Sequence, residues 1–189
     1  MNLDTNNMEA IVAMLMKELK KVENKEEACS CCEAKSGVFH SMDEAITAAK
    51  KAQATLFASR LELRERIVNS IRETLKDYTL ELAELGVSET GMGRVADKKL
   101  KHEVTIAKTP GVEDLKAFAY SGDDGLTVME LSPYGVIGAI TPSTNPSETI
   151  ICNSIGMIAA GNSIVFAPHP GAKRTSIRTV ELINEAVRK

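Results

Sequence analysis

The sequence predicts an α/β fold in which a helical layer leads into an incomplete, doubly wound (Rossmann-like) parallel sheet. Apolar residues recur at helical spacing between residues 41 and 108. Two short apolar runs, 135–140 and 163–167, then alternate with helical segments at 146–160 and 173–188. This alternation indicates parallel strands joined by right-handed helical crossovers. Two such strands are too few to be covered on both faces, so the sheet is expected to need more strands.

The first 37 residues differ in character from the rest of the chain. Residues 1–21 are expected to form an amphipathic helix whose apolar positions are Met8, Ile11, Val12, Leu15 and Leu19. Residues 22–37 are polar and have no apolar period, which predicts a flexible linker. An isolated helix of about 20 residues is only marginally stable, so docking on a partner is expected. Packing on its own domain, or self-association, is the alternative.

A folded body is expected over residues 38–189. Ser41 followed by Glu44 is a capping box, and the helix after it has its apolar stripe at Ala45, Ile46, Ala49, Ala52 and Leu56. Further helices are expected around 63–75, from Leu80 to Gly91, and over 98–108. Residues 91–96 match G-x-G-x-x-A, but they follow a helix rather than a strand, which favours a glycine C-cap over a dinucleotide site.

A hairpin is predicted within residues 117–131. Two strand-like runs flank Gly122-Asp123-Asp124-Gly125, whose composition is typical of a tight turn.

Composition argues against several classes of partner. The net charge of −3 and the 4% of aromatic residues are unlike those of a nucleic-acid-binding protein. No apolar run reaches the ~18 residues of a membrane span, and acidic Asp4 and Glu9 stand where a signal peptide would be basic. We therefore expect a cytoplasmic protein without nucleic-acid or membrane partners. Cys29, Cys31 and Cys32 lack a second pair at zinc-site spacing, so no metal is expected.

The loop from Thr141 joins the first predicted strand to its helix. Asn145 suits the N-cap, Pro146 the first helical position, and Glu148 completes a second capping box. A helix N-terminus at the carboxyl end of a parallel strand also stabilises an anion or a developing oxyanion. If the Asn145 oxygen caps the helix, its amide N–H groups remain free to donate to a reacting carbonyl oxygen. A purely structural cap is the alternative.

A second loop, Pro168-His169-Pro170-Gly171, is expected at the same edge of the sheet, where open α/β sheets bind ligands. Lys173 and Arg174 just beyond it are expected either to meet a phosphate or to be ordinary surface residues. Cys152 lies among isoleucines in the second turn of its helix, so it is expected to be an inert core thiol. The three histidines are scattered, and no catalytic triad can be assembled.

Four blocks then carry a resemblance, namely SETGMGR (88–94), TPGVEDL (109–115), SPYGVIGAITPSTNPSETII (132–151) and AAGNSIVFAPHPGAK (159–173). From residue 38 to the end, the chain resembles the N-terminal part of the NAD-binding domain of coenzyme A-acylating aldehyde dehydrogenases. The similar enzymes are the propionaldehyde and acetaldehyde dehydrogenases of bacterial microcompartments for propanediol, fucose/rhamnose or ethanolamine utilisation. Residues 1–21 resemble the encapsulation peptides that hold such enzymes inside the shell.

The resemblance implies an aldehyde dehydrogenase fold and a reaction in which a cysteine thiolate attacks a short aldehyde, hydride passes to NAD, and the thioester is released to coenzyme A. Thr144 and Asn145 become candidates for supporting the oxyanion. The implied nucleotide-site residues are Thr141, Pro142, Ser143, Ala167, Pro168, His169 and Pro170. The implied partners are a microcompartment shell protein, bound through residues 1–21, and other subunits, joined through the hairpin in the full-length enzyme.

The sequence also departs from the family pattern. The chain ends at Lys189, well short of half the usual length, and the nucleophilic cysteine is expected outside it, so the chain alone is expected to be inactive. Whether Thr144 or Asn145 matches the oxyanion asparagine is open. The usual ribose-binding Lys and Glu are replaced by Ala167 and Pro170, which fits a site shared by NAD and coenzyme A.

Two rival functions remain open at this point. One is a catalytically silent cargo module that docks through its N-terminal helix, and the other is a free-standing nucleotide-binding domain. The sequence does not distinguish acetaldehyde from propionaldehyde as substrate.

Overall fold

The computed structural model of the chain describes residues 36–189, which form one compact unit. The predicted helix of residues 1–21, the linker up to residue 35 and the cysteines Cys29, Cys31 and Cys32 lie outside the described residues.

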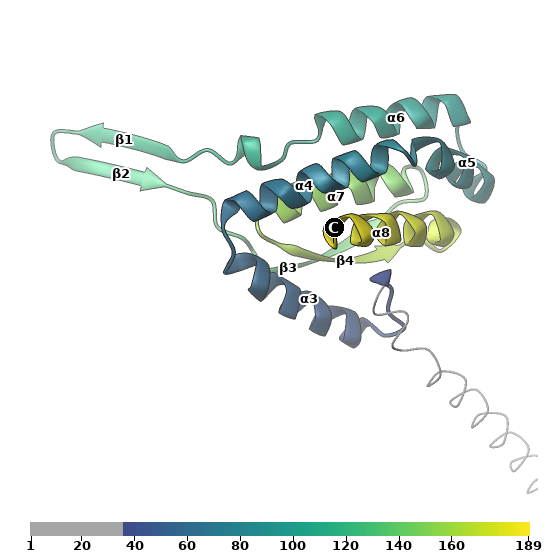
Figure 1. The fold of residues 1–189 in the computed structure, drawn as a ribbon, viewed down its shortest axis with the longest axis horizontal. Helices are drawn as coiled ribbons and strands as arrows, with labels where there is room; N and C mark the ends of the chain where they lie inside the picture. The colour runs from purple at the N-terminus through teal and green to yellow at the C-terminus, as the bar shows by residue number, and fades with distance from the viewer. Residues whose placement is uncertain (1–35) are drawn as a thin grey trace, which may run out of the picture. The chain divides into compact units, whose positions relative to one another are not determined.

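A small parallel sheet has helices on both of its faces (Figure 1). Strands β3 (Val136–Thr141) and β4 (Ser163–Pro168) form the sheet. Helix α3 (Met42–Phe57) lies against one face, and α7 (Pro146–Ala159) contacts the other. The other helices pack around α7: α4 (Leu61–Lys76), α5 (Thr79–Thr90), α6 (Val95–Lys108) and α8 (Lys173–Val187). This arrangement confirms the predicted helical layer leading into a parallel α/β sheet.

The two strands pair in parallel, with Val136 opposite Ser163 and Thr141 opposite Pro168. Within residues 36–189 each strand has one neighbour, as expected of an incomplete sheet. The apolar run 163–167 is typical of a buried strand, but all six residues of β4 are only half-buried, because β4 pairs with one strand alone in residues 36–189. Ile140 on β3 is 88% exposed.

The hydrophobic core lies between the helices rather than on the sheet. Its most deeply buried side chains are Ile71, Leu75, Ile150, Ile151, Ile155 and Leu182. They come from α4, α7 and α8, whose apolar stripes face one another. Helix α3 contributes Ala49, but Ala52, predicted on its buried stripe, is exposed. The reason is that α3 packs on the sheet, which has too few strands to cover the whole stripe.

Two helix ends form as the local sequence predicts. The Ser41 hydroxyl accepts a hydrogen bond from the Glu44 N–H at 3.2 Å and caps α3. Gly91 ends α5 in the left-handed conformation, with φ of 67°. The segment 91–96 is therefore a helix end and the start of α6, and not a dinucleotide loop.

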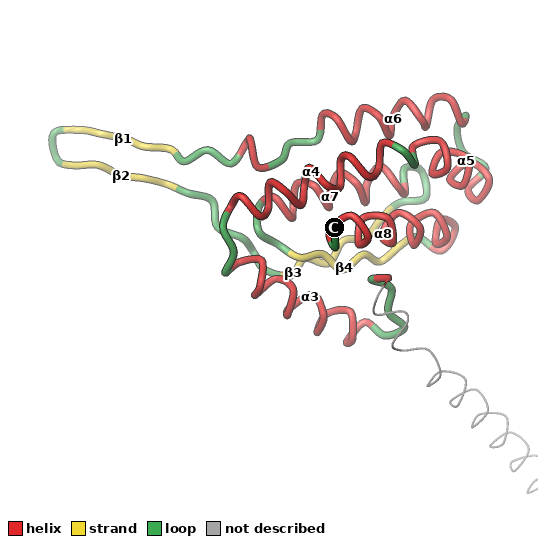
Figure 2. Tube along the Cα trace, viewed as in Figure 1, coloured by secondary structure: helices red, strands yellow, loops and turns green. Residues whose placement is uncertain are grey.

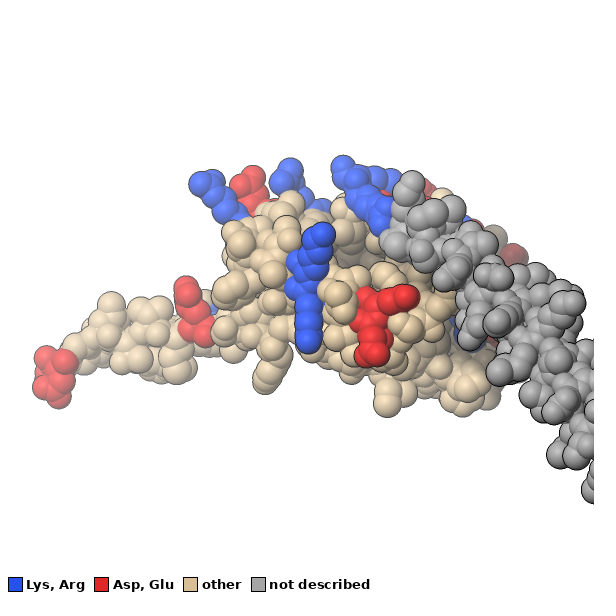
Figure 3. Space-filling model, turned by 90° about the horizontal axis from the view of Figure 1, so that it is seen from below, with Lys and Arg blue, Asp and Glu red and all other residues tan. Residues whose placement is uncertain are grey.

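The predicted hairpin is present and extends away from the helices (Figure 2). Strands β1 (Phe118–Gly122) and β2 (Gly125–Met129) pair in antiparallel fashion around the two-residue turn Asp123-Asp124. Every residue of both strands is exposed. The face of the molecule shown in Figure 3 is largely uncharged, with acidic side chains at the hairpin tip.

A carboxylate from α5 occupies the N-terminus of α8. The Glu89 side chain accepts hydrogen bonds from the N–H groups of Arg174 and Thr175 and from the Thr175 hydroxyl, each at 2.7 Å. It thereby satisfies donors that a helix start leaves unpaired. Of the two alternatives for Lys173 and Arg174, this contact favours ordinary surface residues, because a carboxylate of the chain already binds these backbone donors.

Gly91 and Gly156 offer a matched pair of tests. Replacing Gly91 by Ala is expected to lower the free energy of unfolding by about 1 kcal/mol, since a side chain is disfavoured at positive φ. Open space surrounds both glycines, so no steric clash contributes. Gly156→Ala, inside α7, is expected to raise stability by roughly 0.5–1 kcal/mol. Urea unfolding measures both, and equal effects would contradict the assigned backbone conformation.

Glu89 gives a pH-dependent test. Burial raises the pKa of the Glu89 carboxyl, but the hydrogen bonds from Thr175 and Arg174 outweigh burial and hold the pKa below its ordinary value. A depressed pKa stabilises the fold above the unfolded pKa of about 4.3, and this contribution is lost as the pH falls through the folded pKa. Glu89→Gln is expected to lower the free energy of unfolding at pH 7 by about 1–2 kcal/mol. The free energy of unfolding of this variant should also decrease less than that of the parent when the pH is lowered.

The control is Glu84→Gln, at an exposed position of the same helix. Identical urea midpoints for the two variants at pH 7 would show that the Glu89 contact contributes no stability.

Candidate functional site

The structure brings together the two loops that the sequence placed at one edge of the sheet. Thr141 ends β3 opposite Pro168 of β4. The N–H of His169 donates to the Thr141 carbonyl at 3.1 Å, so the two loops diverge from adjacent points. Of the residues assigned to the nucleotide site or the oxyanion, Thr141 is buried, Ser143, Asn145, Ala167 and Pro168 are half-buried, and Pro142, Thr144, His169 and Pro170 are exposed.

Thr141 has an unusual environment for a hydroxyl. It is 1% exposed, and its Oγ1 has no hydrogen-bond partner in residues 36–189. Most buried hydroxyls in proteins are paired. The end of β3 therefore carries one unsatisfied polar atom, close to where the loops separate.

The turn after β4 is held by its own side chain. The ring Nδ1 of His169 accepts a hydrogen bond from the Gly171 N–H at 3.0 Å. This contact stabilises the short 3₁₀ helix η2 (Pro170–Ala172) that leads into α8. The His169 ring thus has a local structural contact in addition to its place at the sheet edge.

Asn145 stands at the N-cap of α7, but it does not cap the helix with its side chain as predicted. Its backbone carbonyl accepts from the Thr149 N–H at 3.1 Å, whereas its Oδ1 accepts from the Lys101 ammonium at 3.0 Å. An ammonium is a stronger donor than a backbone N–H, which accounts for the difference. Among residues 36–189, the Asn145 Nδ2 has no hydrogen-bond partner.

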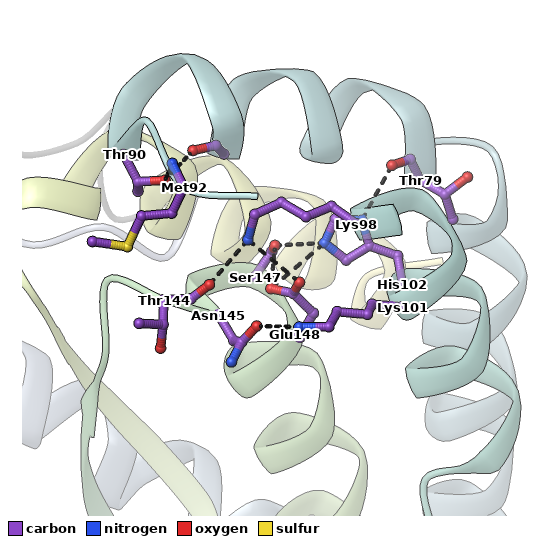
Figure 4. A network of polar contacts seen from close by, with 11 residues as sticks. Thr79, Thr90, Met92, Lys98, Lys101, His102, Thr144, Asn145, Ser147 and Glu148 are labelled. Atoms are coloured by element: carbon purple, nitrogen blue, oxygen red, sulfur yellow. Dashed lines mark hydrogen bonds and ion pairs between the residues drawn. The ribbon is translucent and has the colours of Figure 1, made fainter. Parts of the chain in front are cut away.

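Glu148 does not complete a capping box either. Its carboxylate turns into the protein and lies beside Ser147 and two residues of α6 (Figure 4). Oε1 is 3.7 Å from the Lys98 ammonium, and Oε2 is 3.2 Å from the Ser147 hydroxyl and 3.8 Å from the His102 ring. The carboxylate therefore joins α7 to α6.

His102 is the most deeply buried member of this cluster, at 0% exposure. Its Nδ1 lies 3.2 Å from the Thr79 carbonyl and its Nε2 lies 2.6 Å from the Ser147 hydroxyl. A carbonyl only accepts, so Nδ1 carries the proton, and in the neutral ring Nε2 accepts from Ser147. Burial lowers the pKa of the His102 imidazole, and the nearby Glu148 carboxylate only partly opposes this. The ring is therefore neutral at physiological pH.

Two lysines on α6 contact the loop before α7. The Lys98 ammonium donates to the Thr144 carbonyl at 3.0 Å, while Lys101 donates to Asn145. The lysines are three residues apart and so lie on one face of the helix. Both loop residues considered for the oxyanion are thus held from α6.

Lys98, Lys101 and His102 are not among the site residues predicted from the sequence. The sequence does place these three basic residues on one face of a predicted helix, and this pattern could have indicated a shared partner. Their partners in and beside the loop, Thr144, Asn145 and Ser147, lie more than 40 positions away along the chain, so the spacing alone does not identify them.

Cys152 is a further correction. It is exposed, not a core thiol. The buried face of α7 is formed by Ile150, Ile151, Ser154 and Ile155, and position 152 falls outside it. No group of residues in the described part of the chain has the arrangement of a metal site. No helix in residues 36–189 is long and apolar enough to cross a membrane.

Comparison with known proteins gives consistent matches. The model of the aldehyde dehydrogenase family matches residues 16–188. The acetaldehyde dehydrogenase (acetylating) EutE of Salmonella typhimurium LT2 is 52% identical over 151 residues, which are 80% of this chain and 32% of that protein. The chain therefore spans about a third of the length of this curated relative.

Solved structures agree. A propionaldehyde dehydrogenase from the fucose utilisation microcompartment of Clostridium phytofermentans is 55% identical, with a TM-score of 0.77 over 79% of this chain and 34% of that one. The Rhodopseudomonas palustris propionaldehyde dehydrogenase, solved with bound CoA and an acylated cysteine, is 50% identical, with a TM-score of 0.79 over 81% of this chain and 35% of that one. These similarities confirm the resemblance seen in the sequence, and the chain belongs to the aldehyde dehydrogenase family.

Proposed function

We propose that this chain is the N-terminal part of an NAD-dependent, CoA-acylating aldehyde dehydrogenase of a bacterial microcompartment. The reaction is short aldehyde + CoA + NAD⁺ → acyl-CoA + NADH + H⁺. The observation that carries the proposal is the 52% identity to an acetylating acetaldehyde dehydrogenase. The two loops that meet at the carboxyl edge of the sheet belong to the blocks that carry this likeness.

Asn145 is proposed to support the oxyanion. When a thiolate adds to an aldehyde, the carbonyl oxygen becomes negative and needs donors already in place. The Asn145 Nδ2 is free to donate, because Oδ1 is held by Lys101. Asn145 also stands at the positive end of the α7 dipole. The nucleophilic cysteine is proposed to lie outside these 189 residues, since Cys152 lies beyond the first turn of α7.

One observation in particular supports a nucleotide site at this edge of the sheet. The buried Thr141 hydroxyl lacks a partner at the end of β3, and a ligand bound across the two loops would supply one. The turn Ala167-Pro168 offers an apolar surface for an adenine ring. The nicotinamide cofactor, when bound, supplies a hydride acceptor. The chain's own contribution is to hold the two loops together through the hydrogen bond between His169 and Thr141.

Two partner surfaces complete the proposal. The exposed hairpin of β1 and β2 presents apolar side chains, including Leu126 at 68% exposure, and is proposed to join subunits. Residues 1–21 are proposed to bind a shell protein through their apolar stripe. The rival functions, a silent cargo module and a free-standing nucleotide-binding domain, gain no specific support.

The oxyanion role can be tested in a chimera in which the 151 matched residues replace their counterparts in the Salmonella enzyme. The chimera is expected to form acyl-CoA only with both CoA and NAD⁺, followed by NADH absorbance. Asn145→Ala is expected to lower kcat roughly 10²-fold or more, the effect of losing one oxyanion donor.

Thr144→Ala decides between the two candidates, because only the residue that donates to the oxyanion should show the large loss. Asn69→Ala, at an exposed position of α4, is the control and should leave the rate unchanged. A folded chimera that oxidises no short aldehyde would overturn the proposed function. Full activity in both Asn145→Ala and Thr144→Ala would overturn only the oxyanion assignment.

The shell-binding role of residues 1–21 can be tested by co-purification with co-expressed shell proteins. Replacing Leu15 and Leu19 by Ser removes part of the apolar stripe and is expected to abolish co-purification. Replacing Lys17 and Lys20 by Ser changes the polar side of the expected helix and should have little effect. Equal recovery of both variants with the shell would contradict docking through the apolar stripe.

A further inference from the structure

Lys98 and Lys101 approach the same loop from neighbouring positions on α6, but their surroundings differ. Lys98 is 4% exposed, whereas Lys101 is exposed. Lys98 binds the backbone of the loop at Thr144, and Lys101 binds only the side chain of Asn145. Lys98 therefore stabilises the backbone conformation of the loop, whereas Lys101 orients one of its side chains (Figure 4).

Lys98 belongs to the interior of the protein. A buried ammonium is unfavourable unless it is paired and hydrogen-bonded. Here the Glu148 carboxylate lies 3.7 Å away and the Thr144 carbonyl accepts its hydrogen bond at 3.0 Å. Removing Lys98 would leave Glu148 without its charge partner, so a substitution there would perturb the fold as well as the loop.

Lys101 acts on the orientation of Asn145. An amide group can rotate so that either its oxygen or its NH₂ faces a neighbour, but an ammonium has only donors. Only the Asn145 Oδ1 can therefore face Lys101, and Nδ2 points away from α6, as Figure 4 shows. The positive charge of Lys101 beside the amide oxygen also polarises the amide group and makes its N–H groups better donors.

We propose that Lys101 is a positioning residue that fixes the orientation of the Asn145 amide, so that its N–H groups face the reacting carbonyl oxygen. The inference rests on the proposed function, in which Asn145 supports the oxyanion. In this role Lys101 acts through Asn145, the residue that accepts its hydrogen bond. Because Lys101 is exposed and its hydrogen bond is to a side chain, the fold does not depend on it, and its loss should change the rate without unfolding the protein.

Kinetics of the chimera described above provide the first test. Lys101→Met is expected to lower kcat roughly tenfold or more, with little change in KM for the aldehyde, because it weakens a donor that acts in the transition state. Lys101→Arg keeps a charged donor and should restore most of the rate. Lys101→Met combined with Asn145→Ala should be no slower than Asn145→Ala alone, since Lys101 acts through that residue.

The control is Lys99→Met. Lys99 lies on the same helix and pairs with Glu103 at 3.0 Å, away from the loop. It should leave kcat unchanged. A Lys101→Met enzyme with the parental kcat, or a further loss on combining it with Asn145→Ala, would overturn the positioning role.

Nuclear magnetic resonance of the ¹⁵N-labelled 189-residue chain supplies a readout that needs no activity. The Asn145 side-chain amide signals are assigned by their disappearance in Asn145→Ala. Lys101→Met is expected to shift them and to speed rotation of the amide, whereas Lys99→Met should not. If the signals respond but no chimera oxidises aldehydes, the proposed function fails while the orientation stands. If they do not respond, the positioning role is wrong.

Discussion

The position of the candidate site depends on a buried polar cluster between α6 and the start of α7. Lys98, His102, Ser147 and Glu148 are each less than a tenth exposed. Burying such groups costs free energy, and pairing between them offsets much of that cost. Their contacts fix α6 against the first turn of α7, and Lys98 extends this hold to the Thr144 carbonyl. The loop at the sheet edge is therefore anchored by a charged group, not by apolar packing alone.

The two crossover helices that follow the strands use their N-termini differently. At α8, the Glu89 carboxylate fills the place where an anion would bind. At α7, no side chain of the described residues caps the helix, and the Asn145 oxygen that would serve is drawn to Lys101. Of these two helices, only α7 therefore begins without a side-chain partner for its first N–H groups among the described residues. The hydrogen bond from Lys101 to Asn145 thus explains why α7 has no side-chain cap, and it also orients the amide for the proposed oxyanion site.

Features decided by a few neighbouring residues could be predicted from the sequence. The Ser41 cap, the Gly91 helix end and the turn at Asp123-Asp124 depend on local backbone preferences. The failures involve partners distant in the chain. Asn145 has the composition of a cap, but a lysine 44 positions earlier takes its oxygen. Burial of Cys152 was likewise inferred from its neighbours, whereas exposure depends on which face of α7 the other helices cover.

The incomplete sheet has an energetic consequence. Ile140, Leu131 and Tyr134 are more than three-quarters exposed, and the hairpin adds further apolar side chains. Fully burying one large apolar side chain contributes about 1.5–3 kcal/mol, so covering even a few would rival the stability of a typical domain. Leu131 and Tyr134 precede β3 and Ile140 lies on it, and the carboxyl end of β3 leads into the candidate site. Association that covers Ile140 would also shield the adjoining end of β3 from water, and hydrogen bonds are electrostatically stronger where water is excluded.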